Sequence, residues 1–127
     1  MEKEMNIALW VVQVLVAIMF LLAGFPKTFQ PIDTVAKRLT WAKEVPAWLV
    51  RFIGIAELLG AVGLILPALT HIVPSLTAIA AVGLVLVMVC AIIFHISRKE
   101  YPNISVGVIL LVLAAFVAYG RFVLMPF

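Results

Sequence analysis

One acidic side chain stands inside an apolar stretch of the kind that crosses membranes. Glu57 lies in "RFIGIAELLGAVGLILP", residues 51–67, where the only other charged residue is Arg51. A charge at the centre of a bilayer costs at least about 2.5–3.5 kcal/mol unless something offsets it. We therefore expect that Arg121 pairs with the carboxylate, that the carboxyl is protonated, or that water or a polar ligand lies beside it. Proton exchange is the chemistry that such an acid supports, so Glu57 is the candidate catalytic residue.

Four further polar residues interrupt or end the apolar stretches and are candidate ligand-binding residues: Gln13, Lys27, His95 and Arg121. Their positions place Glu57 near mid-span, Gln13 and Arg121 toward the outer side, and Lys27 and His95 toward the inner side. Structural alternatives stay open. Glu57 could belong to a buried pair that only fixes helix register, and Gln13 could be an interhelical hydrogen bond. Lys27 and Arg121 could extend to the interface, where His95 could also lie without a ligand.

Small residues surround the candidate acid at helical spacing. Gly54 precedes Glu57 by one turn, and Gly60 and Ala61 follow it by one turn, so the carboxylate rises from a face that lacks large side chains. Such faces let membrane helices approach closely. Arg121 ends a similar face on the last apolar stretch, which carries Gly107, Ala114 and Ala118.

The elements that position these residues are membrane helices. Hydrophobic residues make up 66% of the chain, charged residues 12%, and the mean hydropathy is +1.27. About 20 apolar residues cross a bilayer as a helix, whereas barrel strands are shorter and alternate in polarity. The sequence predicts an all-α integral membrane four-helix bundle, one transmembrane domain over 1–127, with a retained first helix. The predicted helices cover 7–25, 48–69, 74–95 and 104–124.

The connection between the first two long helices also shows helical spacing. Asp33 is a possible N-cap, and apolar residues recur from Ile32 to Ala42 while basic residues face elsewhere. We predict a short amphipathic helix over 33–44 in the membrane interface, with Trp41 and Trp48 at headgroup level. A solvated basic loop is the alternative.

Charge and cysteine content limit the possible functions. The net charge of +3 belongs mostly to membrane-flanking residues, so no nucleic-acid partner is expected. Seven Lys or Arg residues lie in the two predicted inner connections and only two on the opposite side, which places both termini outside. Cys90 is the only cysteine, which excludes an intramolecular disulfide. His71 and His95 stand at opposite ends of a helix, and no residues show zinc spacing, so neither haem nor metal is expected.

Four motifs, each at a helix end or within a helix, resemble one family. The ordered set "LLAGFPK", "GIAELLGAVGLILP", "AIIFHISRKE" and "YGR" is similar to the DoxX-like family of small four-helix bacterial membrane proteins. This resemblance implies a bundle in the bacterial inner membrane and emphasises Lys27, Glu57, His95 and Arg121. It also implies a link to a membrane quinone oxidoreductase.

Three functions are compatible with these residues. The leading hypothesis is a redox accessory or quinone-binding subunit in which Glu57 exchanges a proton while Arg121 or His95 fixes the head group. A proton-coupled small-molecule transporter is the alternative. Small multidrug resistance proteins carry such an acid in their first helix, however, whereas here it lies in the second. A noncatalytic assembly partner of another membrane protein is the third. The expected partners are the lipid bilayer and, in addition, further copies of the chain in a homo-oligomer, a membrane redox partner or a small-molecule ligand.

Overall fold

The computed structural model of the protein describes residues 2–126, and the regular structure within that range is entirely helical. Four of its helices, counting the last with the turn that extends it, are long and apolar enough to cross a bilayer. The protein is therefore a multi-pass membrane protein, as predicted. The elements are α1 (Glu2–Phe29), α2 (Ile32–Ala36), the 3₁₀ helix η1 (Thr40–Lys43), α3 (Ala47–Thr70), α4 (Leu76–Ser97), α5 (Pro102–Tyr119) and the π-helical turn η2 (Gly120–Leu124).

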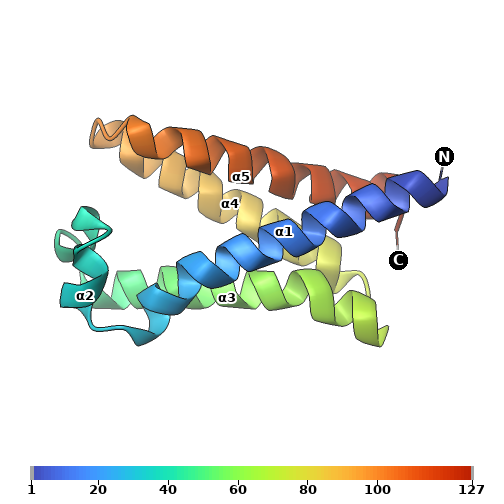
Figure 1. Ribbon diagram of the computed structural model, residues 1–127, viewed down its shortest axis with the longest axis horizontal. Helices are drawn as coiled ribbons and strands as arrows, with labels where there is room; N and C mark the ends of the chain where they lie inside the picture. The colour runs from blue at the N-terminus through green and yellow to red at the C-terminus, as the bar shows by residue number, and fades with distance from the viewer. Residues whose placement is uncertain (1, 127) are drawn as a thin grey trace.

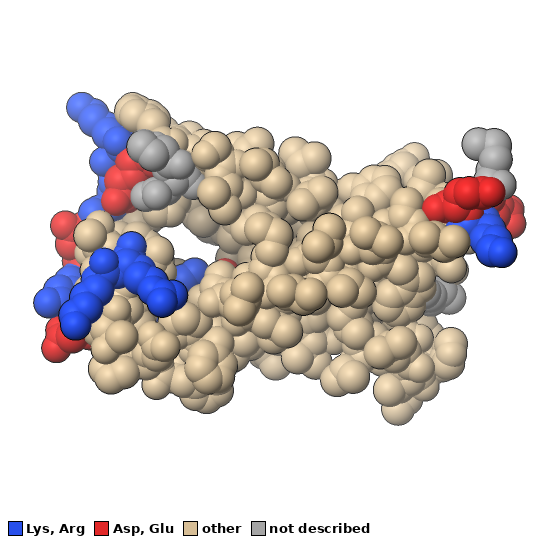
Figure 2. Space-filling view, in the orientation of Figure 1, with Lys and Arg blue, Asp and Glu red and all other residues tan. Residues whose placement is uncertain are grey.

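The first helix runs diagonally across the bundle (Figure 1). It lies beside the first half of α3 at one end and crosses toward the last turns of α5 at the other, while α4 and α5 run side by side. We call the end that carries α2, η1 and the α4–α5 turn the connector end, and the opposite end the terminal end. Charged side chains gather at both ends and leave an uncharged band between them (Figure 2). This distribution fits a middle section in hydrocarbon, where charges are unfavourable.

Two prolines lie inside helices rather than beyond their ends. Pro26 is in the last turn of α1 and Pro67 in the last turn of α3. A proline removes one backbone donor, and near a helix end this loss affects few other bonds. α1 runs past both ends of the segment predicted over 7–25 and includes Pro26, whereas α3 extends the segment predicted over 48–69 by one residue at each end. The segments predicted over 74–95 and 104–124 correspond to α4 and to α5 with η2.

Close contact between α1 and α3 depends on two glycines. A Cβ atom on Gly24 would lie 2.8 Å from the carbonyl oxygen of Gly54 and 3.0 Å from Glu57 Cβ. A Cβ atom on Gly54 would lie 2.5 Å from Thr28 Oγ1 and 2.7 Å from Lys27 Cβ. Without side chains at these positions the two backbones touch, and dispersion contacts hold the helices together in lipid.

The remaining small residues singled out in the sequence also lie between helices. A Cβ atom on Gly60 would meet Leu84 Cδ2 of α4 at 2.5 Å, and one on Gly107 would meet Ile92 Cγ1 at 3.2 Å. The core of the bundle is an apolar cluster with contributions from all four long helices. Its buried members include Val16, Phe20, Ala61, Leu64, Ala81, Leu84, Ala114, Val117 and Ala118.

The connector, residues 30–46, forms two short helical pieces, which differs from the single helix predicted over 33–44. Its first piece, α2, ends at Ala36, and the backbone at Leu39 is extended (φ −117°, ψ 88°) just before η1 begins. The break lets the connector fold back onto the bundle. There Val35, Trp41 and Ala42 pack with Val50 of α3 in a second buried apolar cluster.

The two tryptophans near the connector have different environments. Trp41, predicted to lie at headgroup level, is only 8% exposed and contacts Phe94 edge to face, with ring centroids 5.7 Å apart. Trp48 is 67% exposed. Amphipathic rings at the interface keep one side in contact with lipid, so Trp48 suits that role and Trp41 does not.

Candidate functional site

A buried ion pair joins α1 and α3 near the connector end. Lys27 Nζ donates a hydrogen bond to Glu57 Oε1 at 2.6 Å. The lysine side chain is 12% exposed and the glutamate side chain 2%. The glycine crossing described above brings the last turn of α1 against α3 and so places the amine over the carboxylate. Of the three environments considered for Glu57 in the sequence, the one found is an ion pair, but its partner is Lys27 rather than Arg121.

A second cation fixes the end of the helix that carries Lys27. Arg51 of α3 donates hydrogen bonds from Nη1 to the carbonyl oxygens of Lys27 at 3.0 Å and Gln30 at 2.5 Å. These carbonyls belong to the unpaired end of α1, where a positive charge also interacts favourably with the helix dipole. Sequence reasoning counted Arg51 only as a flanking charge. Its position one turn into α3 gave no indication of the helix end it would cap.

The ion pair borders a cavity of about 550 Å³ at the connector-end half of the bundle. That volume lies within the range of about 300–1,000 Å³ that is usual for small-molecule sites. Helices α1, α3, α4 and α5 and the connector all contribute to the lining, which is mainly apolar. Figure 2 shows an opening into the bundle near this end. Lining residues include Lys27, Trp41, Glu57, Cys90, His95 and Gly107.

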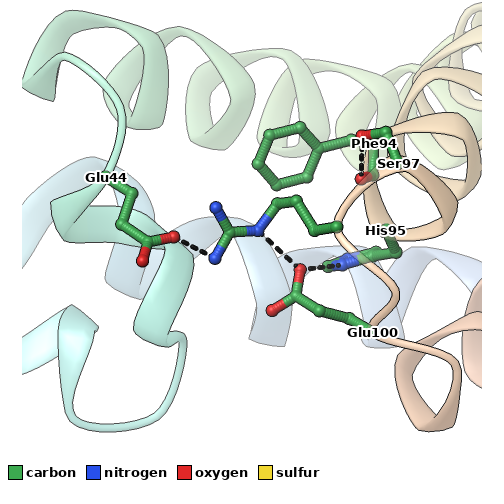
Figure 3. A network of polar contacts seen from close by, with 6 residues as sticks. Glu44, Phe94, His95, Ser97 and Glu100 are labelled. Atoms are coloured by element: carbon green, nitrogen blue, oxygen red, sulfur yellow. Dashed lines mark hydrogen bonds and ion pairs between the residues drawn. The ribbon is translucent and has the colours of Figure 1, made fainter.

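A charged cluster links the connector to the end of α4 and the turn that follows it (Figure 3). Arg98 donates from Nε to Glu100 Oε1 at 2.9 Å and forms an ion pair with Glu44 at the end of the connector. His95 Nδ1 lies 3.1 Å from the same Glu100 oxygen. The hydrogen bond from Arg98, followed by that with His95, holds the pKa of the Glu100 carboxyl below its ordinary value. His95 thus lines the cavity while its ring is oriented by this cluster.

The other two predicted ligand-binding residues lie elsewhere. Arg121 donates from Nε to Gln13 Oε1 at 2.6 Å and from Nη1 to Asn6 Oδ1 at 2.8 Å and to the Met125 carbonyl at 3.1 Å. Gln13 Nε2 in turn donates to the Leu64 carbonyl at 2.9 Å. These bonds tie α1 to η2 and α3 toward the terminal end, and neither Arg121 nor Gln13 lines the cavity.

The predicted group of five polar residues is therefore divided between two places. Lys27, Glu57 and His95 border one cavity, whereas Gln13 and Arg121 are each other's partners in a separate buried network. Asn6 joins that network, and sequence reasoning missed it because it falls before the predicted start of the first helix.

The cavity combines two kinds of recognition. Most of its lining offers apolar and aromatic contact, and the Lys27–Glu57 pair offers an ammonium donor beside a carboxylate acceptor. A lysine ammonium has three N–H donors, and Glu57 accepts only one of them, so the amine retains the capacity to donate to a bound molecule. The arrangement suits binding of a molecule with a polar head and an apolar body, and proton exchange at that head.

Comparison with known protein families assigns the chain to one of them. A model of the DoxX-like family matches residues 11–117, a range that contains most of α1 and all of the cavity lining. Searches of curated proteins and of solved structures each found no match. Because the family model covers most of the chain, the protein belongs to the DoxX-like family of membrane proteins.

Proposed function

We propose that the protein binds a quinone-like molecule and serves as the accessory subunit of a membrane redox partner. The observation that carries this proposal is the Lys27–Glu57 pair in the lining of a mainly apolar cavity. A quinone has a flat apolar ring, carbonyl oxygens that accept hydrogen bonds, and a long hydrocarbon tail. Lys27 would donate to a carbonyl oxygen, and the aromatic and aliphatic walls would contact the ring and tail.

Reduction of a quinone to a quinol takes up two electrons and two protons. The redox partner would supply the electrons, and Glu57 would pass protons to or from the ring oxygens while Lys27 keeps a compensating charge beside it. His95 borders the same cavity from the connector end and is a second group that could orient the head. Arg121, which the sequence offered for this role, has no place in the proposal because it lies outside the cavity.

We further propose that the connector end faces the cytoplasm of a bacterium and that the protein resides in the inner membrane. Support comes from the seven Lys and Arg residues in the two inner connections against two on the other side. The partner would contact the protein within this membrane.

Mass spectrometry of copurifying molecules and thermal melting test the quinone proposal together. Purified wild-type protein is expected to carry quinone and to melt at a higher temperature when quinone is added. Lys27→Met and Glu57→Gln are expected to lose both effects. Thr77→Val is the matched control, because Thr77 is buried in α4 and does not line the cavity.

Two outcomes would contradict the proposal. One is wild-type protein that carries no quinone and whose melting temperature, like that of Glu57→Gln, is unchanged by added quinone. The other is uptake of a small molecule into vesicles driven by a pH gradient without any quinone, which would indicate a proton-coupled transporter.

A further inference from the structure

The charges around the cavity form a compensated set. Among the described residues that line it, Lys27 is the only lysine or arginine and Glu57 the only acid, and Lys27 Nζ lies 2.6 Å from Glu57 Oε1. His95, the other basic residue in the lining, is turned toward Glu100. A neutral head group can therefore enter without disturbing the charge balance. An ion would enter uncompensated, which is unfavourable in an apolar cavity.

The pair presents both a donor and an acceptor. Lys27 donates one N–H to Glu57 Oε1, and its Nζ also lies 5.9 Å from the centre of the Trp41 ring. Within residues 2–126, Glu57 Oε2 takes part in none of the hydrogen bonds found, so it is open to a donor from a bound molecule. An amide or hydroxyl head would satisfy both groups, since each combines a donor and an acceptor.

The exposed part of the cavity lining is apolar, which favours entry from lipid. Three lining residues from different helices, Phe52, Leu86 and Val106, are 64%, 60% and 56% exposed and so form the rim on the lipid-facing surface. On the aqueous side, the connector contributes Trp41 to the lining and is held down by the Arg98–Glu44 ion pair. A molecule dissolved in the bilayer therefore meets an exposed apolar rim, whereas one dissolved in water meets the connector, which lies against the cavity.

From these three features we infer that the cavity selects electrically neutral amphiphiles from the bilayer and excludes both anionic and cationic ones of the same chain length. The Lys27–Glu57 pair sets this selectivity, because each member repels the ions that the other would attract. Removal of one member should invert the charge preference rather than abolish binding. This inference shares with the proposed function the premise that the cavity binds a ligand, and it does not require that the ligand is a quinone.

Native mass spectrometry tests this selectivity on the protein in nanodiscs of phosphatidylcholine, with an equimolar mixture of dodecanamide, dodecyl sulfonate and dodecylammonium. Wild type and Thr77→Val are expected to retain the amide over either ion by about tenfold. Glu57→Gln should raise sulfonate binding by about tenfold, since the ammonium is left without its carboxylate. Lys27→Met should favour dodecylammonium instead.

The double variant Lys27→Met with Glu57→Gln leaves no unpaired charge and should return to the preference for the amide. It also keeps the test decisive if Lys27→Met does not fold. An unchanged order of the three ligands in wild type, Glu57→Gln and the double variant, or equal binding of sulfonate and amide to wild type, would overturn the inference. Neutral preference without any quinone binding would refute the proposed function alone.

Discussion

Lys27 and Glu57 each carry a charge that the surrounding apolar side chains could not stabilise singly. Together they form a short ion pair, and neither is exposed by more than 12%. Such pairs often contribute little net stability relative to apolar replacements, but loss of one member leaves the other buried without compensation. Replacement of one member should therefore destabilise the protein strongly, whereas replacement of both should change its stability little.

Single substitutions of the pair should destabilise the protein more than the double one. We expect Lys27→Met and Glu57→Gln each to lower the free energy of unfolding by about 3 kcal/mol, because each strands a buried partner. The double variant should lose much less than the sum, which unfolding curves in a constant detergent would measure. Additive losses would show that the two side chains do not interact.

Glu100 should make the connector-end cluster sensitive to acid. Its pKa is lowered below 4.5, first by the hydrogen bond from Arg98. A lowered folded-state pKa means that the stabilisation is complete above the unfolded value and is lost as the pH falls through the folded one. The melting temperature of wild type should therefore fall more steeply than that of Glu100→Gln as the pH is lowered through the range in which the Glu100 carboxylate takes up a proton. Parallel pH profiles would contradict this contact.

At the scale of the helices, the α1–α3 crossing decides where the ion pair lies. Gly24 and Gly54 let the two backbones touch, and Arg51 holds the last turn of α1 in place. A side chain at the crossing would separate the helices and move Lys27 away from the carboxylate. Gly83, in contrast, faces open space, since a Cβ atom there would meet nothing within 4 Å.

Alanine substitutions at Gly54 and at Gly83 should affect stability differently. Gly54→Ala places a methyl group 2.5 Å from Thr28 Oγ1 and 2.8 Å from the Thr28 backbone nitrogen, so we expect a loss of about 1–3 kcal/mol in stability. Gly83→Ala should be neutral or stabilising by up to about 1 kcal/mol, since alanine favours helix. Thermal melting of both variants would measure this difference, and equal melting temperatures would argue against close packing at Gly54.

The connector should open when its ion pair to α4 is removed. Cys90 lines the cavity and is the only cysteine, so its reaction with a charged, membrane-impermeant maleimide reports aqueous access. Glu44→Gln breaks the contact with Arg98 and should raise the labelling rate several-fold. Asp33→Asn, which removes only the exposed pair with Lys43, is the control and should react like wild type. Equal rates in all three proteins would rule out a closing role for the Glu44–Arg98 pair.

Helical periodicity predicted which faces turn inward but not where they meet. Small residues three and four positions from Glu57 indicated a contact face, because side chains one turn apart share a side of the helix. Whether Arg121 or Lys27 reaches the acid depends on the diagonal course of α1, which periodicity does not contain. The connector was predicted as one helix because its apolar spacing is helical. Its break at Leu39 follows from packing of Trp41 and Val35 on the bundle, a tertiary effect.

At the scale of the whole molecule, charge distribution and the cavity are related. The connector end carries most of the basic residues, and the cavity opens in the same half of the bundle. If that end is cytoplasmic, the cavity lies in the inner leaflet, where it would collect molecules from the cytoplasmic half of the bilayer.

Reporter fusions should show the termini outside. Alkaline phosphatase fused after Phe127 is expected to be active and green fluorescent protein at that position dark, because the positive-inside rule places the basic connections in the cytoplasm. Fusions that end after Lys43, within the connector, should give the reverse pattern. Active phosphatase in the connector would reverse the proposed orientation.

The buried ion pair also has a consequence for biosynthesis. Lys27 belongs to α1 and Glu57 to α3, the next membrane helix along the chain, 30 residues later. Alone, α3 would bring an uncompensated carboxylate into the bilayer at a cost of about 2.5–3.5 kcal/mol. Beside α1 that carboxylate meets its lysine at once. The two helices should therefore insert together as a hairpin, because Lys27 of α1 compensates the charge of Glu57 while α3 enters the bilayer.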